Sequence, residues 1–287
     1  MKGYTSLHVH TRFCDGADDM ETMCRAAFDA GLEAIGFSSH APAGDLLPDT
    51  RWNMKRESLE RYVAEGRAAG ERWKGKLRVF LGLELDYARG LRGSGDADIV
   101  ELRASGALDY LIGSVHYIAP ERGELFTIDG SREKMLEKMR AAGLSPREVA
   151  EAYWDAVREM AALGGIDVVG HMDLIKMHFG DEPFSAEWEG KAADAVRAIA
   201  GAGLVVEAST GGINRGRLRE LCPSPAILRL LKEAGARVMV SADAHRAADV
   251  AGNYGLAREA LLAAGYESHA VMAGAREGSP LWREIPL

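Results

Sequence analysis

The chain has 287 residues, 47% of them hydrophobic and 27% charged, which is typical of a globular protein with a large buried core. Its 35 basic and 43 acidic residues give a formal net charge of −8. This balance disfavours a general nucleic-acid-binding protein, which needs a basic surface, but it leaves room for a local basic pocket that binds a small phosphate ester.

Three scattered cysteines (Cys14, Cys24 and Cys222) and the lack of any CxxC pair exclude a disulfide framework and a structural zinc ribbon. The sequence shows no signal-peptide pattern and no apolar run that approaches the length of a membrane-spanning helix. We therefore expect a cytoplasmic protein.

The predicted secondary structure alternates between short β-rich runs and longer helical stretches. In chain order the elements are strand Tyr4–His10, helix Asp19–Ala30, strand Ala34–Ser39, helix Arg56–Trp73, strand Arg78–Tyr87, helix Asp96–Ser105, strand Tyr110–Ile118, helix Ser145–Leu163, strand Asp167–His171, helix Ser185–Ala200, strand Leu204–Ala208, helix Ser224–Ala234, strand Arg237–Ser241 and helix Ala247–Ala263.

This alternation favours parallel strands that are covered by helices, and the short, almost wholly apolar strands fit a sheet buried on both faces. An open doubly wound sheet is the alternative, but no GxGxxG or GxxxxGK[ST] motif follows the first strand. We predict an α/β fold in which the strands close into a barrel, as one domain over residues 1–287. Residues 121–143 are expected to form an insertion that caps a pocket.

Six of the eight histidines are predicted to lie at or just beyond the C-terminal end of a strand: His8, His10, His40, His116, His171 and His245. Parallel barrels bring these strand ends together at one face, where their active sites lie. Taken alone, any one of these histidines is most simply interpreted as a buried core residue whose ring is hydrogen-bonded. Six at the same end of five strands favour a metal cluster instead, because burying that many imidazoles without partners costs stability.

Carboxylates follow the same pattern, since Asp15 follows the first strand, Glu84 lies in the third, and Asp243 follows the seventh. In a strand, residues i and i+2 point the same way, so His8 and His10 present two imidazoles to one side. Imidazole and carboxylate ligands together suit Zn²⁺, Fe²⁺ or Mn²⁺.

Six stretches of the chain, in this order, resemble the PHP (polymerase and histidinol phosphatase) family of metal-dependent phosphoesterases. They read HVHTRFCDG, FSSHAP, LGLELDY, IGSVHYI, VGHMDLIK and SADAH, and they extend from His8 to His245. Within the family, the sequence is most similar to the monofunctional histidinol-phosphate phosphatases. The resemblance implies a distorted (β/α)7 TIM-like barrel with a trinuclear centre of Zn, Fe or Mn.

The resemblance also implies how the ligands are shared among three metals. His8 and His10 would bind one metal together with Glu84 and Asp243. Asp15, His40 and His245 would hold a second metal. Glu84 would bridge to a third metal, completed by His116 and His171. Asp173 is expected to orient one of the imidazoles from behind.

For catalysis we expect a metal-activated water to attack phosphorus, and Asp243, His245 or His178 to assist proton transfer to the leaving group. The sequence leaves the choice among these three residues open. A dianionic phosphate also needs fixed cations, for which Lys176, Arg215 and Arg246 are the candidates.

The expected function is therefore that of a metal-dependent phosphomonoesterase that hydrolyses L-histidinol phosphate in histidine biosynthesis. One alternative is a PHP phosphoesterase that acts on another small ester, such as a nucleotide or sugar phosphate. A PHP exonuclease fits the acidic charge less well, and an amidohydrolase would need a strand-end lysine between its metals. A metal-binding module without catalysis would be expected to lack ligands, whereas all nine positions are filled.

Overall fold

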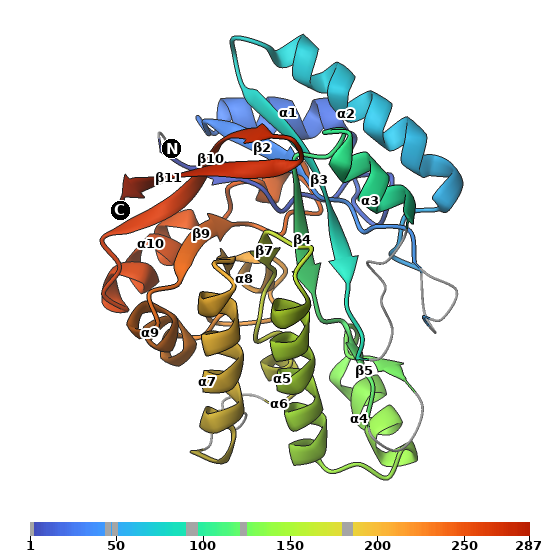
Figure 1. The fold of residues 1–287 in the computed structure, drawn as a ribbon, viewed down its shortest axis with the longest axis vertical. Coiled ribbons are helices and arrows are strands. Elements are labelled where there is room, and N and C mark those ends of the chain that lie inside the picture. Colours follow the sequence, from blue (N-terminus) through green and yellow to red (C-terminus); the bar gives the residue numbers. More distant parts are fainter. Residues whose placement is uncertain (1–2, 44–46, 48–50, 90–96, 121–124, 180–185) are drawn as a thin grey trace.

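The computed structural model describes residues 3–43, 47, 51–89, 97–120, 125–179 and 186–287 (Figure 1). Seven parallel strands form one sheet in the order β1-β2-β3-β4-β7-β8-β9. The strands are β1 (Thr5–Ser6), β2 (Ala34–Phe37), β3 (Arg78–Asp86), β4 (Tyr110–Ser114), β7 (Val168–Val169), β8 (Val205–Ser209) and β9 (Arg237–Ser241).

The two edges of this sheet meet just beyond β1 and β9. The backbone N–H of His10 donates to the carbonyl of Ala244 at 2.8 Å, and the N–H of Ala244 donates to the carbonyl of His8 at 3.0 Å. The sheet is therefore a nearly closed barrel, and the predicted fold is confirmed.

Helices cover the outside of the barrel (Figure 1). They are α1 (Met20–Asp29), α2 (Leu59–Trp73), α3 (Ala97–Ala104), α5 (Pro146–Leu163), α7 (Ala186–Gly201), α9 (Pro225–Glu233) and α10 (Tyr254–Ala263). At the start of α5 the Ser145 side chain accepts a bond from the N–H of Glu148, and the Glu148 carboxylate accepts one from the N–H of Ser145. This reciprocal cap satisfies two backbone donors of the first turn. None of the described helices has the length and hydropathy needed to cross a membrane.

Side chains that point into the barrel change in character along each strand. In β3, Phe80 lies in the apolar cluster at the N-terminal end, whereas Glu84 and Asp86 follow at even spacing toward the C-terminal end. In β8, Val205 and Glu207 repeat the same change. Because residues two apart share a face of the strand, one end of the barrel interior is hydrocarbon and the other is ionisable.

An antiparallel hairpin of β10 (Ser268–Arg276) and β11 (Ser279–Pro286) packs against the apolar end of the barrel. Ala270 and Met272 of this hairpin belong to the same apolar cluster as Phe80. These two strands were not predicted from the sequence. They leave the opposite end, where the strands terminate, for the polar side chains.

Two predicted elements are interrupted. The helix predicted at Ala247–Ala263 is a 3-10 turn at Ala247–Asp249 followed by α10, because Asn253 adopts a left-handed backbone with φ of 58°. The strand predicted at Tyr110–Ile118 divides into β4 and β5 (Tyr117–Ile118), and β5 pairs with β6 (Phe126–Thr127) instead of with the barrel.

The predicted insertion, residues 121–143, contains β6 and α4 (Arg132–Ala141), and its residues 121–124 lie outside the described part of the chain. Asp129 of this segment lines the cavity at the C-terminal end of the barrel. Two predicted helix starts, Asp96 and Ser185, also fall outside the described residues.

Candidate metal centre

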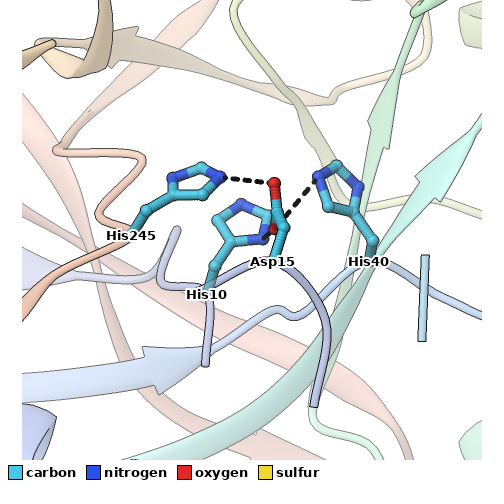
Figure 2. Close-up of side chains that lie close together, drawn as sticks. All are labelled: His10, Asp15, His40 and His245. Carbon is cyan, nitrogen blue, oxygen red and sulfur yellow. Dashed lines mark ion pairs between the residues drawn. The ribbon is translucent and has the colours of Figure 1, made fainter. Parts of the chain in front are cut away.

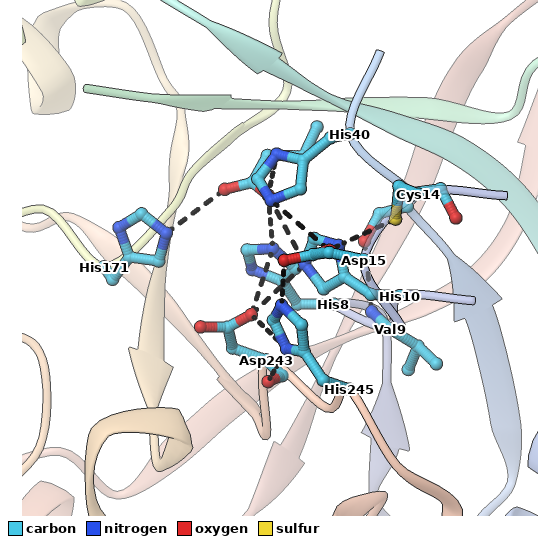
Figure 3. Close-up of polar contacts among 12 residues, drawn as sticks. His8, Val9, His10, Cys14, Asp15, His40, His171, Asp243 and His245 are labelled. Carbon is cyan, nitrogen blue, oxygen red and sulfur yellow. Dashed lines mark hydrogen bonds and ion pairs between the residues drawn. The ribbon is translucent and has the colours of Figure 1, made fainter. Parts of the chain in front are cut away.

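Nine side chains converge at the C-terminal end of the barrel, and Figure 3 labels His8, His10, Asp15, His40, His171, Asp243 and His245 among them. They are the nine ligands expected from the sequence: His8, His10, Asp15, His40, Glu84, His116, His171, Asp243 and His245. All but Asp15 and His245 are buried. The strand-end pattern is what brings them together, because parallel strands of a barrel end at the same face.

Glu84 lies at the centre of the group with 1% of its side chain exposed. Its Oε2 lies 3.2 Å from Nε2 of His8, 3.4 Å from Nε2 of His10 and 3.1 Å from Nδ1 of His40. Its Oε1 lies 3.1 Å from Nε2 of His171. One carboxylate thus faces imidazoles from several strands, which is the position of a bridging ligand.

A second carboxylate, Asp15, lies between the imidazoles of His10, His40 and His245 (Figure 2). It approaches His245 at 3.3 Å, His10 at 3.7 Å and His40 at 3.9 Å. Its own side chain is 34% exposed and that of His245 is 22% exposed. This part of the group therefore faces the cavity entrance.

The third carboxylate, Asp243, lies 3.2 Å from Nε2 of His10 and 3.7 Å from Nε2 of His8. Its other oxygen accepts a 2.6 Å hydrogen bond from Arg215. The backbone of Asp243 has a φ of 44°, a left-handed conformation that costs energy in residues other than glycine and is concentrated at functional sites.

The hydrogen bonding of these residues fits a centre that binds several metal ions. Nε2 of His8, Nε2 of His10, Nδ1 of His40 and Oε2 of Glu84 are buried and have no hydrogen-bond partner in the described part of the chain. Buried polar atoms are normally satisfied, so four buried lone-pair donors that face each other without hydrogen bonds fit the binding of a metal ion. Their nitrogen and oxygen types suit Zn²⁺, Fe²⁺ or Mn²⁺.

The local electrostatics hold His10 and Asp15 in their ligating states, whereas at His8, His116 and His245 the nearby carboxylates outweigh the effect of burial and raise the pKa of the imidazole. Burial, together with the charges of His245 and His40, lowers the pKa of His10 to about 3. Burial opposes ionisation of Asp15, but hydrogen bonding to His245 and the nearby imidazoles hold its pKa below the usual range. Neutral imidazole and ionised carboxylate are the forms that bind metal.

Two further carboxylates were missed by the sequence analysis, and each orients one imidazole. Glu207 is fully buried, lies 2.8 Å from Nδ1 of His8 and accepts a hydrogen bond from the Ser241 hydroxyl. Asp86 lies 2.5 Å from Nδ1 of His116. Such carboxylate–imidazole pairs fix the ring and increase its basicity toward a metal. The even spacing of Glu84 and Asp86 was a usable signal for the second of them.

The role expected for Asp173 is corrected by the structure. Its Oδ2 accepts a 2.7 Å bond from the N–H of Ser224 and lies 3.1 Å from Nζ of Lys176. Among the described residues its carboxylate therefore pairs with a lysine and a backbone amide, and not with an imidazole. Glu207 and Asp86 occupy the orienting positions instead.

Of the three predicted phosphate-binding cations, Arg215 is the one that the structure places in the wall of the cavity. Lys176 is 3% exposed, donates to the carbonyl of Leu221 and pairs with Glu220, so its ammonium faces the protein interior. Arg246 pairs with Asp249 at 3.0 Å and is also not among the described residues that line the cavity.

The predicted catalytic residues divide in the same way. Asp243 and His245 line the cavity, whereas His178 is not among the described residues that do so. The Nε2 atom of His178 is in hydrogen-bond contact with the carbonyl of Ile128, and its own carbonyl accepts a bond from Arg132. His178 thus anchors the segment that contains Asp129.

The sequence and the fold resemble those of known proteins. The model of the PHP domain matches residues 6–211. The chain is 31% identical to a probable histidinol-phosphatase of Deinococcus radiodurans over 87% of this chain and 89% of that protein. It is 29% identical to a histidinol-phosphatase of Bacillus subtilis over 89% and 97%.

Among solved structures, the fold is similar to that of a histidinol phosphate phosphatase of Lactococcus lactis that was determined with Zn, L-histidinol and phosphate. The TM-score is 0.71 at 20% sequence identity, with 97% of this chain and 98% of that chain covered. At this identity the likeness shows the fold.

Proposed function

The chain belongs to the PHP domain family, and from this premise we propose that it is a metal-dependent phosphatase that hydrolyses L-histidinol phosphate to L-histidinol and phosphate. The observation that carries the proposal is the convergence of nine imidazoles and carboxylates, seven of which line one cavity together with Arg215. The identity of the substrate, and with it a role in histidine biosynthesis, is inferred from the relatives named histidinol-phosphatase.

The nine residues would hold three divalent ions. His8, His10 and Asp243 form one group with mutual contacts, and His10, Asp15, His40 and His245 form another. His8, Glu84 and His171 form a third, with His116 Nε2 3.7 Å from the same Glu84 carboxylate. When bound, the metals supply Lewis-acid stabilisation of the phosphoryl oxygens and a nucleophilic water at neutral pH.

The chain itself supplies a fixed cation for the phosphate. Arg215 donates to the Asp243 side chain at 2.6 Å and to the Asp243 carbonyl at 2.8 Å, so its guanidinium is held at the edge of the cluster. Its Nε is buried without a partner in the described chain. A planar guanidinium that is positioned in this way matches the geometry of a phosphate dianion.

The leaving alcohol departs on the open side of the cluster. Asp15 and His245 are the exposed members of the group, and they contact each other at 3.3 Å. We assign protonation of the leaving group to this side, where the predicted catalytic residues His245 and Asp243 line the cavity. His178 is assigned to anchoring because its ring contacts the backbone of Ile128.

The test is phosphate release from L-histidinol phosphate and from a panel of nucleotide and sugar monophosphates, with protein loaded with Mn²⁺ or Zn²⁺ and a chelated control. We expect a preference for L-histidinol phosphate that chelation abolishes. If phosphate is released from another ester but not from L-histidinol phosphate, the proposed substrate is wrong. If phosphate release continues after complete removal of metal, the proposed metal-dependent mechanism is wrong. Asp243→Asn should lose activity, whereas Asp194→Asn, a change of an acidic residue on α7, should retain it.

A further inference from the structure

One carboxylate in the cavity wall has no part in the metal centre. Among the described residues that line the cavity, the acidic side chains are Asp15, Glu84, Asp243 and Asp129. The first three contact the imidazoles of the cluster, whereas Asp129 contributes to none of the four groups of ligands. Asp129 comes from the segment after β6, which does not belong to the barrel sheet.

The backbone around Asp129 is tied to the metal centre. The N–H of Ile128 donates to the carbonyl of His116 at 2.8 Å, and the Thr127 hydroxyl donates to the same carbonyl at 3.1 Å. The N–H of Asp129 in turn donates to the Thr127 hydroxyl at 3.0 Å. From the other side, His178 contacts the carbonyl of Ile128. Asp129 is therefore held at a defined position one short step from a cluster imidazole.

The Asp129 side chain is positioned by Arg217, whose guanidinium donates to Oδ1 at 3.1 Å. The two side chains are 34% and 48% exposed, so the pair lies at the rim and not in the deep part of the cavity. Within the described chain Oδ2 of Asp129 accepts no hydrogen bond. The rim thus presents a carboxylate with one oxygen fixed and the other available.

We propose that Asp129 determines specificity by binding the ammonium group of the substrate, so that the cavity prefers phosphate monoesters of amino alcohols to esters of uncharged alcohols. This inference rests on the proposed function. The phosphate is drawn to the metals and Arg215, so the alcohol portion extends toward the rim. In L-histidinol phosphate the ammonium is on the carbon next to the ester CH₂, within reach of a carboxylate on that path.

The expected size of the effect follows from the exposure of the pair. A partly exposed ammonium–carboxylate contact changes kcat/KM by about 2- to 5-fold. The informative comparison uses two substrates that differ only in the ammonium group: L-histidinol phosphate and its des-amino analogue, 3-(imidazol-4-yl)propyl phosphate. The quantity measured is the ratio of the two kcat/KM values.

We expect this ratio to be about 2 to 5 in the wild-type enzyme and to approach 1 in Asp129→Asn. Asp129→Glu keeps a carboxylate and should restore most of the ratio. Asp194→Asn removes the same charge from an arginine-paired carboxylate on α7 and should keep the wild-type ratio. Comparison of circular dichroism melts would show that the variants are folded.

Two outcomes would overturn the inference. A wild-type ratio near 1 would show that the ammonium is not recognised, whatever the variants do. An unchanged ratio in Asp129→Asn would show that Asp129 only pairs with Arg217. Failure of the proposed function is distinguishable from both, because in that case the wild-type enzyme would release phosphate from neither substrate.

Discussion

His269 provides a stability test that is independent of the metal centre. It lies in β10, is 1% exposed and stacks on Tyr4 with ring centroids 4.6 Å apart. Neither ring nitrogen forms a hydrogen bond of standard geometry in the described chain, and its interaction with the backbone of Gly3 is weak. Burial lowers the pKa of His269 to about 4 from an ordinary value of 6.5, although the backbone of Gly3 opposes this change slightly. His269 is one of the two histidines outside the strand-end pattern of the sequence, and it belongs to none of the candidate metal-binding groups of the described residues.

The sign of the effect follows from which state binds the proton more tightly. Below pH 6.5 the unfolded chain protonates this imidazole while the folded protein keeps it neutral, so stability is complete above pH 6.5 and falls toward pH 4. The full shift corresponds to about 3 kcal/mol, and about 2 kcal/mol of it is lost between pH 7 and pH 5.

The perturbation is His269→Phe, which keeps an aromatic ring against Tyr4 and cannot titrate. Urea unfolding of metal-free wild-type and variant protein at pH 7 and pH 5 gives the difference between their losses, in which the shared titration of the metal ligands cancels. The wild type should lose about 2 kcal/mol more than the variant over this interval. Equal losses would refute the argument that burial keeps this imidazole neutral.

Three further predictions follow from contacts near the site. Glu207→Gln should weaken metal binding by about 10- to 100-fold, because His8 loses its carboxylate partner. Competition with a chromophoric chelator measures the metal affinity, and an unchanged affinity would contradict the prediction. Lys176→Met should cost about 3–5 kcal/mol of unfolding free energy, because Asp173 is left buried without its cation; a loss below about 1 kcal/mol would argue against the pair. Arg246→Ala should leave KM within about twofold, because this side chain pairs with Asp249 at an exposed position; a large rise in KM would return it to the substrate site.

The barrel was predictable because its strands are marked by local composition and separated by amphipathic helices. The hairpin at the C-terminal end was not, and its turn explains why. Glu277 and Gly278 connect β10 to β11, and both have positive φ values, of 52° and 71°. Such turns are usually signalled by Asn-Gly or Asp-Gly, so a glutamate in the first position hides the hairpin. Pro280 and Pro286 further weaken the strand pattern of β11.

The break before α10 has a similar origin. Asn253 takes a left-handed conformation more readily than most residues, and it ends the turn that follows Ala247–Asp249. Helical periodicity continues across it, because residues on both sides pack against the same core. Periodicity therefore predicts which face is buried but not whether the backbone is continuous.

The convergence of the nine side chains proposed as metal ligands was predictable because the topology of a parallel barrel makes distant strand ends neighbours. What the pattern could not supply was the distinction between a ligand and a group that orients one. Glu84 and Asp86 point to the same side of β3 and are equally acidic in the sequence. The structure separates them by their partners: Oε2 of Glu84 is buried with no hydrogen bond, whereas Asp86 is bonded to His116 and to Asn53.

That difference also explains why the cations were harder to assign than the ligands. A strand-end lysine such as Lys176 can turn toward the cavity or toward the protein interior, and the choice depends on the carbonyl of Leu221 and the carboxylate of Asp173, which come from other loops. Arg215 faces the cavity because Asp243 holds it there. The position of a residue in the sequence determines the strand end at which it lies. The direction of a long, flexible side chain depends instead on contacts with residues that become neighbours only in the folded chain.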